Sequence, residues 1–453
     1  LASSALPLAS AILWDPVVNG RRYLRSVRAM SMMGVEAGSD PSEPGSLVAI
    51  GNYLAAPTVS SIDDLDLQKI SSAQIENALI ISRPGAADSR RLAAVLEAAG
   101  VPTALEERAG TEKMLDCAAE QSEVPQAIVK RMVDWLHQHP SGSVKRTSTP
   151  LPQHATLDSP NGKWTEEHIS IGPQALNAVL TLPRYPRFAG AVVMANNGVA
   201  RAIGPARAWV QWSRLWAELG IASLRLDVGG LGDSQPHPGR EPLVNYPIEA
   251  IDDIAAAVAE LKGRGLAPAV AVGLCSGAFL SLDAAAADVG LEGVVGINAQ
   301  TFYLPDRPGS PQRRRRAAPP TQPWVQRFLE NTRVGRRLAR LLPYPVWRLL
   351  DLLGLQPSPL RGADIARTKA PILLIYGDTN IGLMRLQQRG RGDLRRWQEH
   401  GWLTIMAGLD HSMFAPQIRE RVEVQVRAFL LKLLPVIPDP TAPTSGRQQE
   451  SES

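Results

Sequence analysis

The 453-residue chain has few cysteines, few aromatic residues and no long apolar run. Its two cysteines, Cys117 and Cys275, cannot form a disulfide framework, so we expect a reduced, cytoplasmic setting. No stretch is long and apolar enough to predict a membrane-spanning helix. The apolar start, residues 1–13, lacks both an initiator Met and a basic leader, and we expect no signal peptide there.

The chain also lacks a strong net charge and the motifs of several ligand classes. A net charge of +4 is too small to predict a protein that binds nucleic acid. No His/Cys cluster has the spacing of metal ligands, and no glycine-rich loop ends in a phosphate-binding lysine. We therefore expect no metal, no cofactor and no nucleic-acid partner.

One short stretch organises our interpretation of the sequence. Residues 269–274 are small or β-branched, and residues 273–277 read Gly-Leu-Cys-Ser-Gly before an apolar, alanine-rich run. This pattern predicts a strand, a sharp turn and a helix, with Cys275 at the strained apex of the turn. The flanking glycines would let the backbones cross without a Cβ clash. A helix N-terminus favours a negative charge, so we expect it to stabilise the Cys275 thiolate.

Strands alternate with helices along the chain, which predicts an α/β fold with a mostly parallel sheet covered on both faces. We expect a larger domain over 161–435, a smaller α/β domain over 1–140 and a Ser-, Thr- and Pro-rich linker over 141–160. The Pro-, Ser- and Gln-rich tail 436–453 is typical of disorder. The predicted strands of the larger domain cover residues 166–171, 175–182, 191–195, 221–226, 269–274, 293–297, 371–376 and 402–406.

The smaller domain matches the back half of the larger one when the two are aligned. Residues 78–82 fall on 372–376, and Lys113 falls on His411. We interpret 1–140 as a partial second copy of the domain that lacks the sharp turn and its nucleophile. The alternative is that the two parts are unrelated α/β domains.

A nucleophile on such a turn needs a base, and the base needs a group that orients it. His411 follows the last predicted strand, which is the place of the base in the chain order nucleophile, acid, histidine. The other six histidines fit that order less well, and the alternative for His411 is an ordinary surface-loop imidazole.

The acid is expected after the penultimate strand, where Asp378 is the only carboxylate of its loop and Asn380 offers an amide. An amide can orient a histidine that serves a thiolate. We favour Asp378 narrowly as the catalytic acid and keep Asn380 as the alternative orienting group. A third interpretation is that Asp378 only caps the turn.

The predicted oxyanion hole has two donors. The first is the backbone N–H of Ser276, directly after the apex. The second is expected in the loop that follows residues 191–195, where Asn197 and Gly198 tolerate positive φ and would form a tight polar turn over a pocket. The same residues also suit an ordinary strand-ending turn. Asp227, after the fourth strand, lies off the triad order and is expected to be structural.

These motifs together resemble the α/β-hydrolase family over residues 164–434. The stretches 196–198, 229–234 and 273–278 look like those of bacterial serine-aminopeptidase-like hydrolases, some of which are associated with exopolysaccharide or exosortase systems. The resemblance extends to the first part of the chain, where 13–20 is similar to the stretch after the nucleophile turn of the same group.

The resemblance implies acyl-transfer chemistry with a nucleophile at Cys275 and a base at His411. We expect a hydrolase or acyltransferase that acts on a small-molecule ester or thioester, with amide hydrolysis ranked lower. The sequence departs from the family where Asn196-Asn197 replaces a frequent histidine-glycine and where Asn380 stands at the usual spacing of the acid. The alternative is a non-catalytic scaffold or partner-binding protein of the same fold.

A long segment over 301–360 has no strand pattern and stands where this fold carries a lid. It contains Arg313–Arg316 and a cationic amphipathic run over 328–355. We expect a lid with a solvated basic face. The alternative is docking on an anionic membrane surface, on an acidic glycan or on an acyl-carrier partner.

Overall fold

The chain divides into two compact units in its computed structural model. Unit 1 comprises Leu1–Ala37 and Pro41–Leu151, and unit 2 comprises Gly38–Asp40 and Pro152–Ser453. The predicted lid over 301–360, apart from a few single positions, and Cys117 lie outside the described residues. The structure describes residues 7–33, 44–49, 52–69, 74–116, 123–140, 155–198, 200–240, 242–243, 249–299, 368–389 and 391–437, with single residues between 328 and 349.

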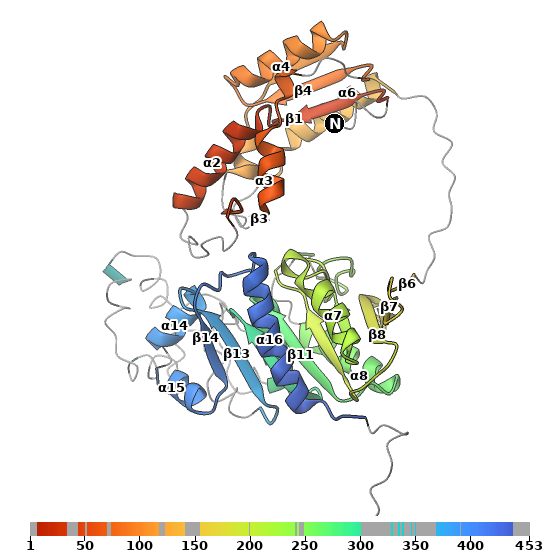
Figure 1. Cartoon of the computed structure of the whole chain (residues 1–453), viewed down its shortest axis with the longest axis vertical. Helices are drawn as coiled ribbons and strands as arrows, with labels where there is room; N and C mark the ends of the chain where they lie inside the picture. Colours follow the sequence, from red (N-terminus) through yellow and green to blue (C-terminus); the bar gives the residue numbers. More distant parts are fainter. Residues whose placement is uncertain are drawn as a thin grey trace, which may run out of the picture. The chain divides into compact units, whose positions relative to one another are not determined.

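Unit 2 is built on a nine-stranded sheet with the strand order β14-β13-β12-β11-β9-β10-β8-β7-β6 (Figure 1). Strands β9 to β14 are mutually parallel, and β8, β7 and β6 continue the sheet as antiparallel neighbours. The strands are β6 (Thr156–Asp158), β7 (Trp164–Ile171), β8 (Leu176–Pro183), β9 (Ala191–Ala195), β10 (Ala222–Leu226), β11 (Ala269–Leu274), β12 (Leu291–Ile297), β13 (Ile372–Gly377) and β14 (Leu403–Met406).

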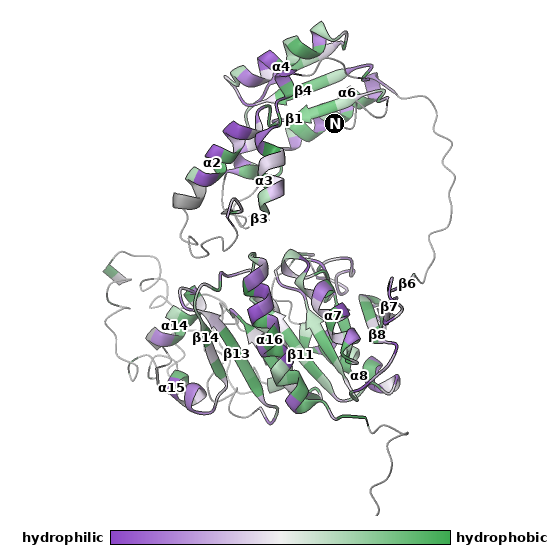
Figure 2. Ribbon diagram, viewed as in Figure 1, coloured by the Kyte–Doolittle hydropathy of each residue, from purple (hydrophilic) through white to green (hydrophobic). Residues whose placement is uncertain are grey.

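Helices cover both faces of this sheet. One face packs against α7 and α16, and the other packs against α8 and α9, because side chains alternate along the strands. Val192 and Met194 of β9 face the first pair of helices, and Val193 faces the second. Figure 2 shows β11 and β13 hydrophobic along their length, as strands buried on both faces require. The helices are η3 (Pro205–Arg207), α7 (Ala208–Glu218), α8 (Ala250–Gly263), α9 (Ser276–Ala286), α14 (Ile381–Arg389), α15 (Arg391–Glu399) and α16 (Pro416–Leu433).

The predicted fold class is confirmed, since a mostly parallel sheet with helices on both faces and a sharp turn between β11 and α9 is an α/β-hydrolase fold. Local details differ from the prediction. The polar stretch between β13 and β14 forms α14 and α15, whose Leu386 and Trp397 are buried in the core. Three residues of the predicted linker 141–160 form β6, which pairs with β7. At the start of the predicted tail, Val436 makes a bridge with Phe188.

Unit 1 contains a three-stranded parallel sheet with the order β1-β4-β5 and a small hairpin of β2 and β3. Leu79 and Ile81 of the central strand pack on α6, whereas Ile80 packs on α4. The elements are β1 (Ala11–Trp14), α2 (Gly20–Met33), β2 (Leu47–Ala49), β3 (Asn52–Leu54), α3 (Ala56–Asp63), η1 (Leu67–Lys69), β4 (Ala78–Ser82), α4 (Ala87–Ala98), β5 (Thr103–Glu107), α5 (Thr111–Leu115) and α6 (Gln126–Gln138).

The order β1-β4-β5 has the same form as β12-β13-β14 of unit 2. Asp15 follows β1 and Asn298 follows β12, and both adopt positive φ, 44° and 48°. Asp15 N donates to Ile81 O at 2.7 Å, and Asn298 N donates to Ile375 O at 2.8 Å. These positions therefore share a local geometry, and the duplication itself stays a prediction.

Within the described ranges, no helix combines the length and the apolar character needed to cross a membrane.

The crossing of backbones after β11 can be tested with a glycine replacement. A Cβ at Gly277 would lie 2.3 Å from the carbonyl oxygen of Asn196, so we expect Gly277→Ala to lower the free energy of unfolding by about 1–3 kcal/mol or more. Gly263→Ala is the matched control, because a Cβ there meets nothing within 4 Å and alanine favours the end of α8 by up to about 1 kcal/mol. Chemical denaturation followed by tryptophan fluorescence measures both. Equal midpoints for the two variants would contradict the close crossing.

Candidate active site

Cys275 lies between β11 and α9, at the place that the sequence predicted. Its backbone is strained, with φ 55° and ψ −115°, and it is the N-cap residue of α9. A Cβ at Gly273 would lie 2.2 Å from the carbonyl carbon of Gly277, so both flanking glycines are required for this turn. The turn presents a thiol at the carboxyl edge of the parallel strands, where ligands of open α/β sheets bind.

Burial shifts the Cys275 thiol toward its neutral form. Burial raises the pKa of the thiol above its ordinary value, and the hydrogen bond from the backbone N–H of Ser276 lowers it by less. The N–H at the start of α9 therefore acts in the expected direction, but desolvation of the sulfur has the larger effect on the pKa of the thiol.

Asn298 joins the cysteine turn to the histidine loop. Its side chain is fully buried at the end of β12, and its Nδ2 donates to the carbonyl oxygens of Asp410 at 2.9 Å and His411 at 3.0 Å. Its Oδ1 accepts the N–H of Gly377 at 2.9 Å. One residue earlier, Ile297 O accepts the N–H of Cys275 at 2.9 Å. The end of β12 therefore contacts both segments, a role that the sequence did not reveal.

His411 is partly buried in the loop after β14, as predicted from the order of elements. Leu409 and Met413 on either side of it belong to the apolar cluster against which Cys275 packs. Burial lowers the pKa of His411 below its ordinary value, and the nearby charge of Asp410 opposes that shift. The imidazole and the thiol are thus both shifted toward their neutral forms.

The side chain that contacts the His411 ring is Asn380, not Asp378. Asn380 is buried, and its Nδ2 lies 3.2 Å from His411 Nδ1. Asp378 is exposed, and its Oδ1 accepts the backbone N–H groups of Thr379 and Gly408. The choice of Asp378 as catalytic acid was therefore wrong in its geometry. The alternative interpretation, that Asp378 caps the turn, describes its contacts.

The two backbone N–H groups expected to form the oxyanion hole donate to other atoms of the protein. Gly198 has a positive φ of 53°, as expected for a tight turn, but its N–H donates to Ser276 Oγ at 2.6 Å. The N–H of Ser276 is directed at the sulfur of Cys275. Asn197 Oδ1 is buried and lacks a hydrogen-bond partner among the described residues. The Ser276 hydroxyl thus fastens the β9 loop to the cysteine turn, and Gly198 would be free to donate only if that hydroxyl moved.

Asn196 bonds the loop after β9 to the residues that follow β10. Its Nδ2 donates to Asp227 Oδ1, and its Oδ1 accepts the N–H of Val228 at 2.7 Å. Asp227 is fully buried and also accepts from Asn177 Nδ2 at 2.8 Å and from the N–H of Asp233 at 2.9 Å. This network supports a structural role for Asp227, since both oxygens of its buried carboxylate accept hydrogen bonds.

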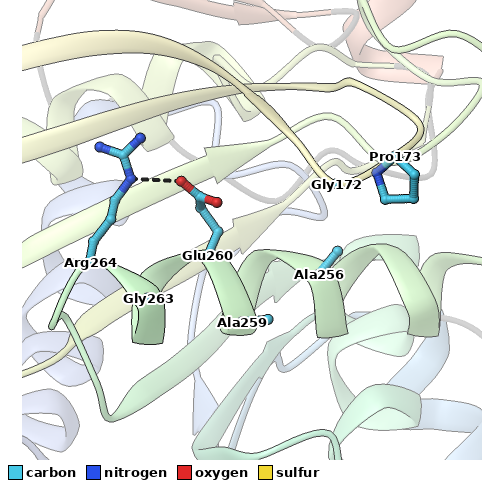
Figure 3. Close-up of a pocket in the computed structure, with 7 residues that line it drawn as sticks. All are labelled: Gly172, Pro173, Ala256, Ala259, Glu260, Gly263 and Arg264. Atoms are coloured by element: carbon cyan, nitrogen blue, oxygen red, sulfur yellow. Dashed lines mark hydrogen bonds and ion pairs between the residues drawn. The ribbon is translucent and has the colours of Figure 1, made fainter.

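Two further features lie apart from these residues. His237 Nε2 is 2.9 Å from Asp253 Oδ1, and Gly229 N donates to the other oxygen at 2.8 Å, so this pair fastens the loop after β10 to α8. A shallow hollow of about 660 Å³ lies between α8 and the turn that joins β7 to β8, where Arg264 bonds Glu260 (Figure 3). No residue predicted for the active site lines this hollow.

No protein-family model and no curated protein sequence matches the chain. Solved structures with a similar fold include a dienelactone hydrolase from Anabaena variabilis, with 14% identity, a TM-score of 0.37, and coverage of 62% of this chain and 99% of that one. A Pyrococcus furiosus esterase has 12% identity, a TM-score of 0.37, and coverage of 60% and 93%. Mouse alpha/beta hydrolase domain-containing protein 10 has 15% identity, a TM-score of 0.34, and coverage of 58% and 99%.

The exposed position of Asp378 gives a direct test. Because its carboxylate only caps a turn, we expect Asp378→Asn to change the rate of iodoacetamide labelling at Cys275, and any ester turnover, by less than about threefold. Removal of the carboxylate from a working triad instead lowers turnover by about 10⁴-fold. A loss of that order in Asp378→Asn would restore Asp378 as the acid.

Proposed function

We propose that the chain hydrolyses or transfers acyl groups of small-molecule esters or thioesters through Cys275. The observation that carries the proposal is the thiol on a strained turn between two obligatory glycines, at the edge of the sheet to which Asn298 also brings the His411 loop. This geometry supports nucleophilic catalysis, because strained backbone at a sheet edge is typical of functional sites.

The proposed reaction has two steps. His411 accepts the thiol proton while the sulfur attacks the carbonyl carbon, and the alcohol or thiol leaving group departs with that proton, which leaves an acyl group on Cys275. Water or an acceptor hydroxyl then attacks the acyl carbon, and the Cys275 thiol is regenerated. A reducing compartment, expected from the low cysteine content, would keep the sulfur competent.

Esters and thioesters suit the site better than amides. An amide leaving group must be protonated as it departs, which requires a protonated imidazole, and burial lowers the pKa of His411. The sequence resemblance to serine-aminopeptidase-like hydrolases of exopolysaccharide or exosortase systems supports an acyl-transfer role in that context, with peptide cleavage ranked lower.

The second candidate is a non-catalytic protein of the same fold that binds a partner or a ligand. The amide of Asn380 at the place of the acid favours it, because the NH₂ group of that amide faces the His411 ring and a donor cannot stabilise the charge of an imidazolium. Turnover of p-nitrophenyl acetate or butyrate separates the two candidates. Absence of turnover in a folded protein favours the non-catalytic one.

Active-site labelling tests the roles of Cys275 and His411. In a Cys117→Ser background, we expect iodoacetamide or fluorophosphonate labelling to disappear in Cys275→Ala and to slow at least about tenfold in His411→Ala, since the base activates the thiol. His400→Ala is the matched control, because His400 is exposed and precedes β14, whereas His411 follows that strand. The proposal fails if labelling is equal in all variants.

We also propose that the basic segment 301–360 docks on an anionic membrane surface. Its support is the charge of the sequence, in which Arg313–Arg316 precedes a cationic amphipathic run. We expect co-sedimentation with vesicles that contain anionic lipid and not with zwitterionic vesicles, with the binding lost when Arg313–Arg316 is replaced by serine. No binding to anionic vesicles at low salt rejects membrane docking and leaves an acyl-carrier partner or an acidic glycan as the occupant to test.

A further inference from the structure

The side-chain amide of Asn380 has a fixed orientation. Its Oδ1 accepts the backbone N–H of Gly382 at 2.8 Å. Because a backbone N–H can only donate, the oxygen of the amide must face Gly382, and the NH₂ group must be the one that faces His411. That nitrogen lies 3.2 Å from His411 Nδ1.

Hydrogen bonds to the main chain hold the backbones of both partners in place. Asn380 is 6% exposed, its backbone N–H donates to Gly377 O at 3.1 Å, and its carbonyl accepts from Met384 N at 3.0 Å. The histidine is held through its own carbonyl oxygen, which accepts from Asn298 Nδ2 at 3.0 Å. The residues after β12 and β13 therefore fix the backbones that carry the pair, and Gly382 fixes the direction of the amide.

We infer that Asn380 is a positioning residue that holds His411 in the neutral tautomer with its proton on Nε2. An amide NH₂ can only donate, so Nδ1 must be the acceptor of this contact, and the single proton of a neutral imidazole is left on the other ring nitrogen. The direction of the contact is the reverse of that in a carboxylate–histidine pair, in which Nδ1–H donates to the acid.

The direction of this hydrogen bond has a consequence for catalysis, which rests on the proposed function. A histidine that takes a proton on Nε2 must carry its other proton on Nδ1, where it would face the NH₂ of Asn380, donor against donor. Proton transfer from Cys275 therefore requires the amide to rotate, at the expense of the bond from Gly382. Asp410 adds a negative charge nearby, but its carboxylate accepts the N–H groups of Ser412 and Phe414.

The tautomer can be measured on the full-length protein without any assumption about activity. In protein labelled with ¹⁵N-histidine, ring nitrogens with and without a proton have well-separated chemical shifts, and the signals absent from His411→Gln identify His411. We expect Nε2 protonated and Nδ1 unprotonated at neutral pH. A proton on Nδ1, or an imidazolium, in the wild-type protein would overturn the inference.

Asn380→Asp reverses the polarity with almost no change of shape. One carboxylate oxygen can still accept from Gly382, and the other can accept from Nδ1–H, so we expect the ring proton to move to Nδ1. With Nε2 then free to accept a proton, iodoacetamide labelling of Cys275 at neutral pH should rise at least about tenfold, and ester turnover by up to about 10⁴-fold. Asp378→Asn, two residues earlier and exposed, is the control and should leave the tautomer of His411 unchanged.

The two readouts separate this inference from the proposed function. A tautomer that moves to Nδ1 in Asn380→Asp without any ester turnover upholds the positioning role and rejects the acyl-transfer proposal. Unchanged tautomer and labelling in a folded Asn380→Asp protein, whose fold is checked by its thermal unfolding, reject the positioning role.

Discussion

The contact between the backbone of Gly277 and the carbonyl oxygen of Asn196 sets the distance between α9 and the end of β9. There is no room for a Cβ in that contact, so the helix begins directly against the neighbouring strand end. The turn that precedes it must then be compressed, which places Cys275 at positive φ. The surrounding packing can hold this strain because residues 276–285 of α9 are buried. The thiol and the β9 loop are adjacent for the same reason.

The carboxyl edge of the sheet is organised by amides. Asn196 after β9, Asn298 after β12 and Asn380 after β13 are all buried, and each uses both its oxygen and its nitrogen in hydrogen bonds. A buried amide that is fully bonded avoids the desolvation penalty of a buried carboxylate. Because the Asn380 side chain is neutral, its contact with the His411 ring supplies no negative charge. The amides therefore stabilise the polar network, but the amide of Asn380 does not stabilise an imidazolium at His411.

The sequence was sufficient to predict the strands β7 to β14, the sharp turn and the edge on which Cys275 and His411 lie, because strand and helix periodicities are local. It was not sufficient to choose between Asp378 and Asn380. That choice depends on the path of the chain after Gly377, where a Cβ would lie 1.9 Å from the carbonyl oxygen of Leu409. Beyond this glycine Asp378 is exposed and Asn380 is buried. The direction of the amide depends in turn on the N–H of Gly382 at the start of α14, a helix that the sequence pattern did not predict.

The shift of Cys275 and His411 toward their neutral forms bears on which substrates a thiol at this site could use. With ordinary pKa values of about 8.5 for cysteine and 6.5 for histidine, moving a proton from thiol to imidazole is unfavourable by about 2.7 kcal/mol. Burial raises the first value and lowers the second, so the transfer is less favourable still. Attack must then rely on a carbonyl with a good leaving group, because such a carbonyl needs little help from an imidazolium. Activated esters and thioesters meet that condition, and amides do not.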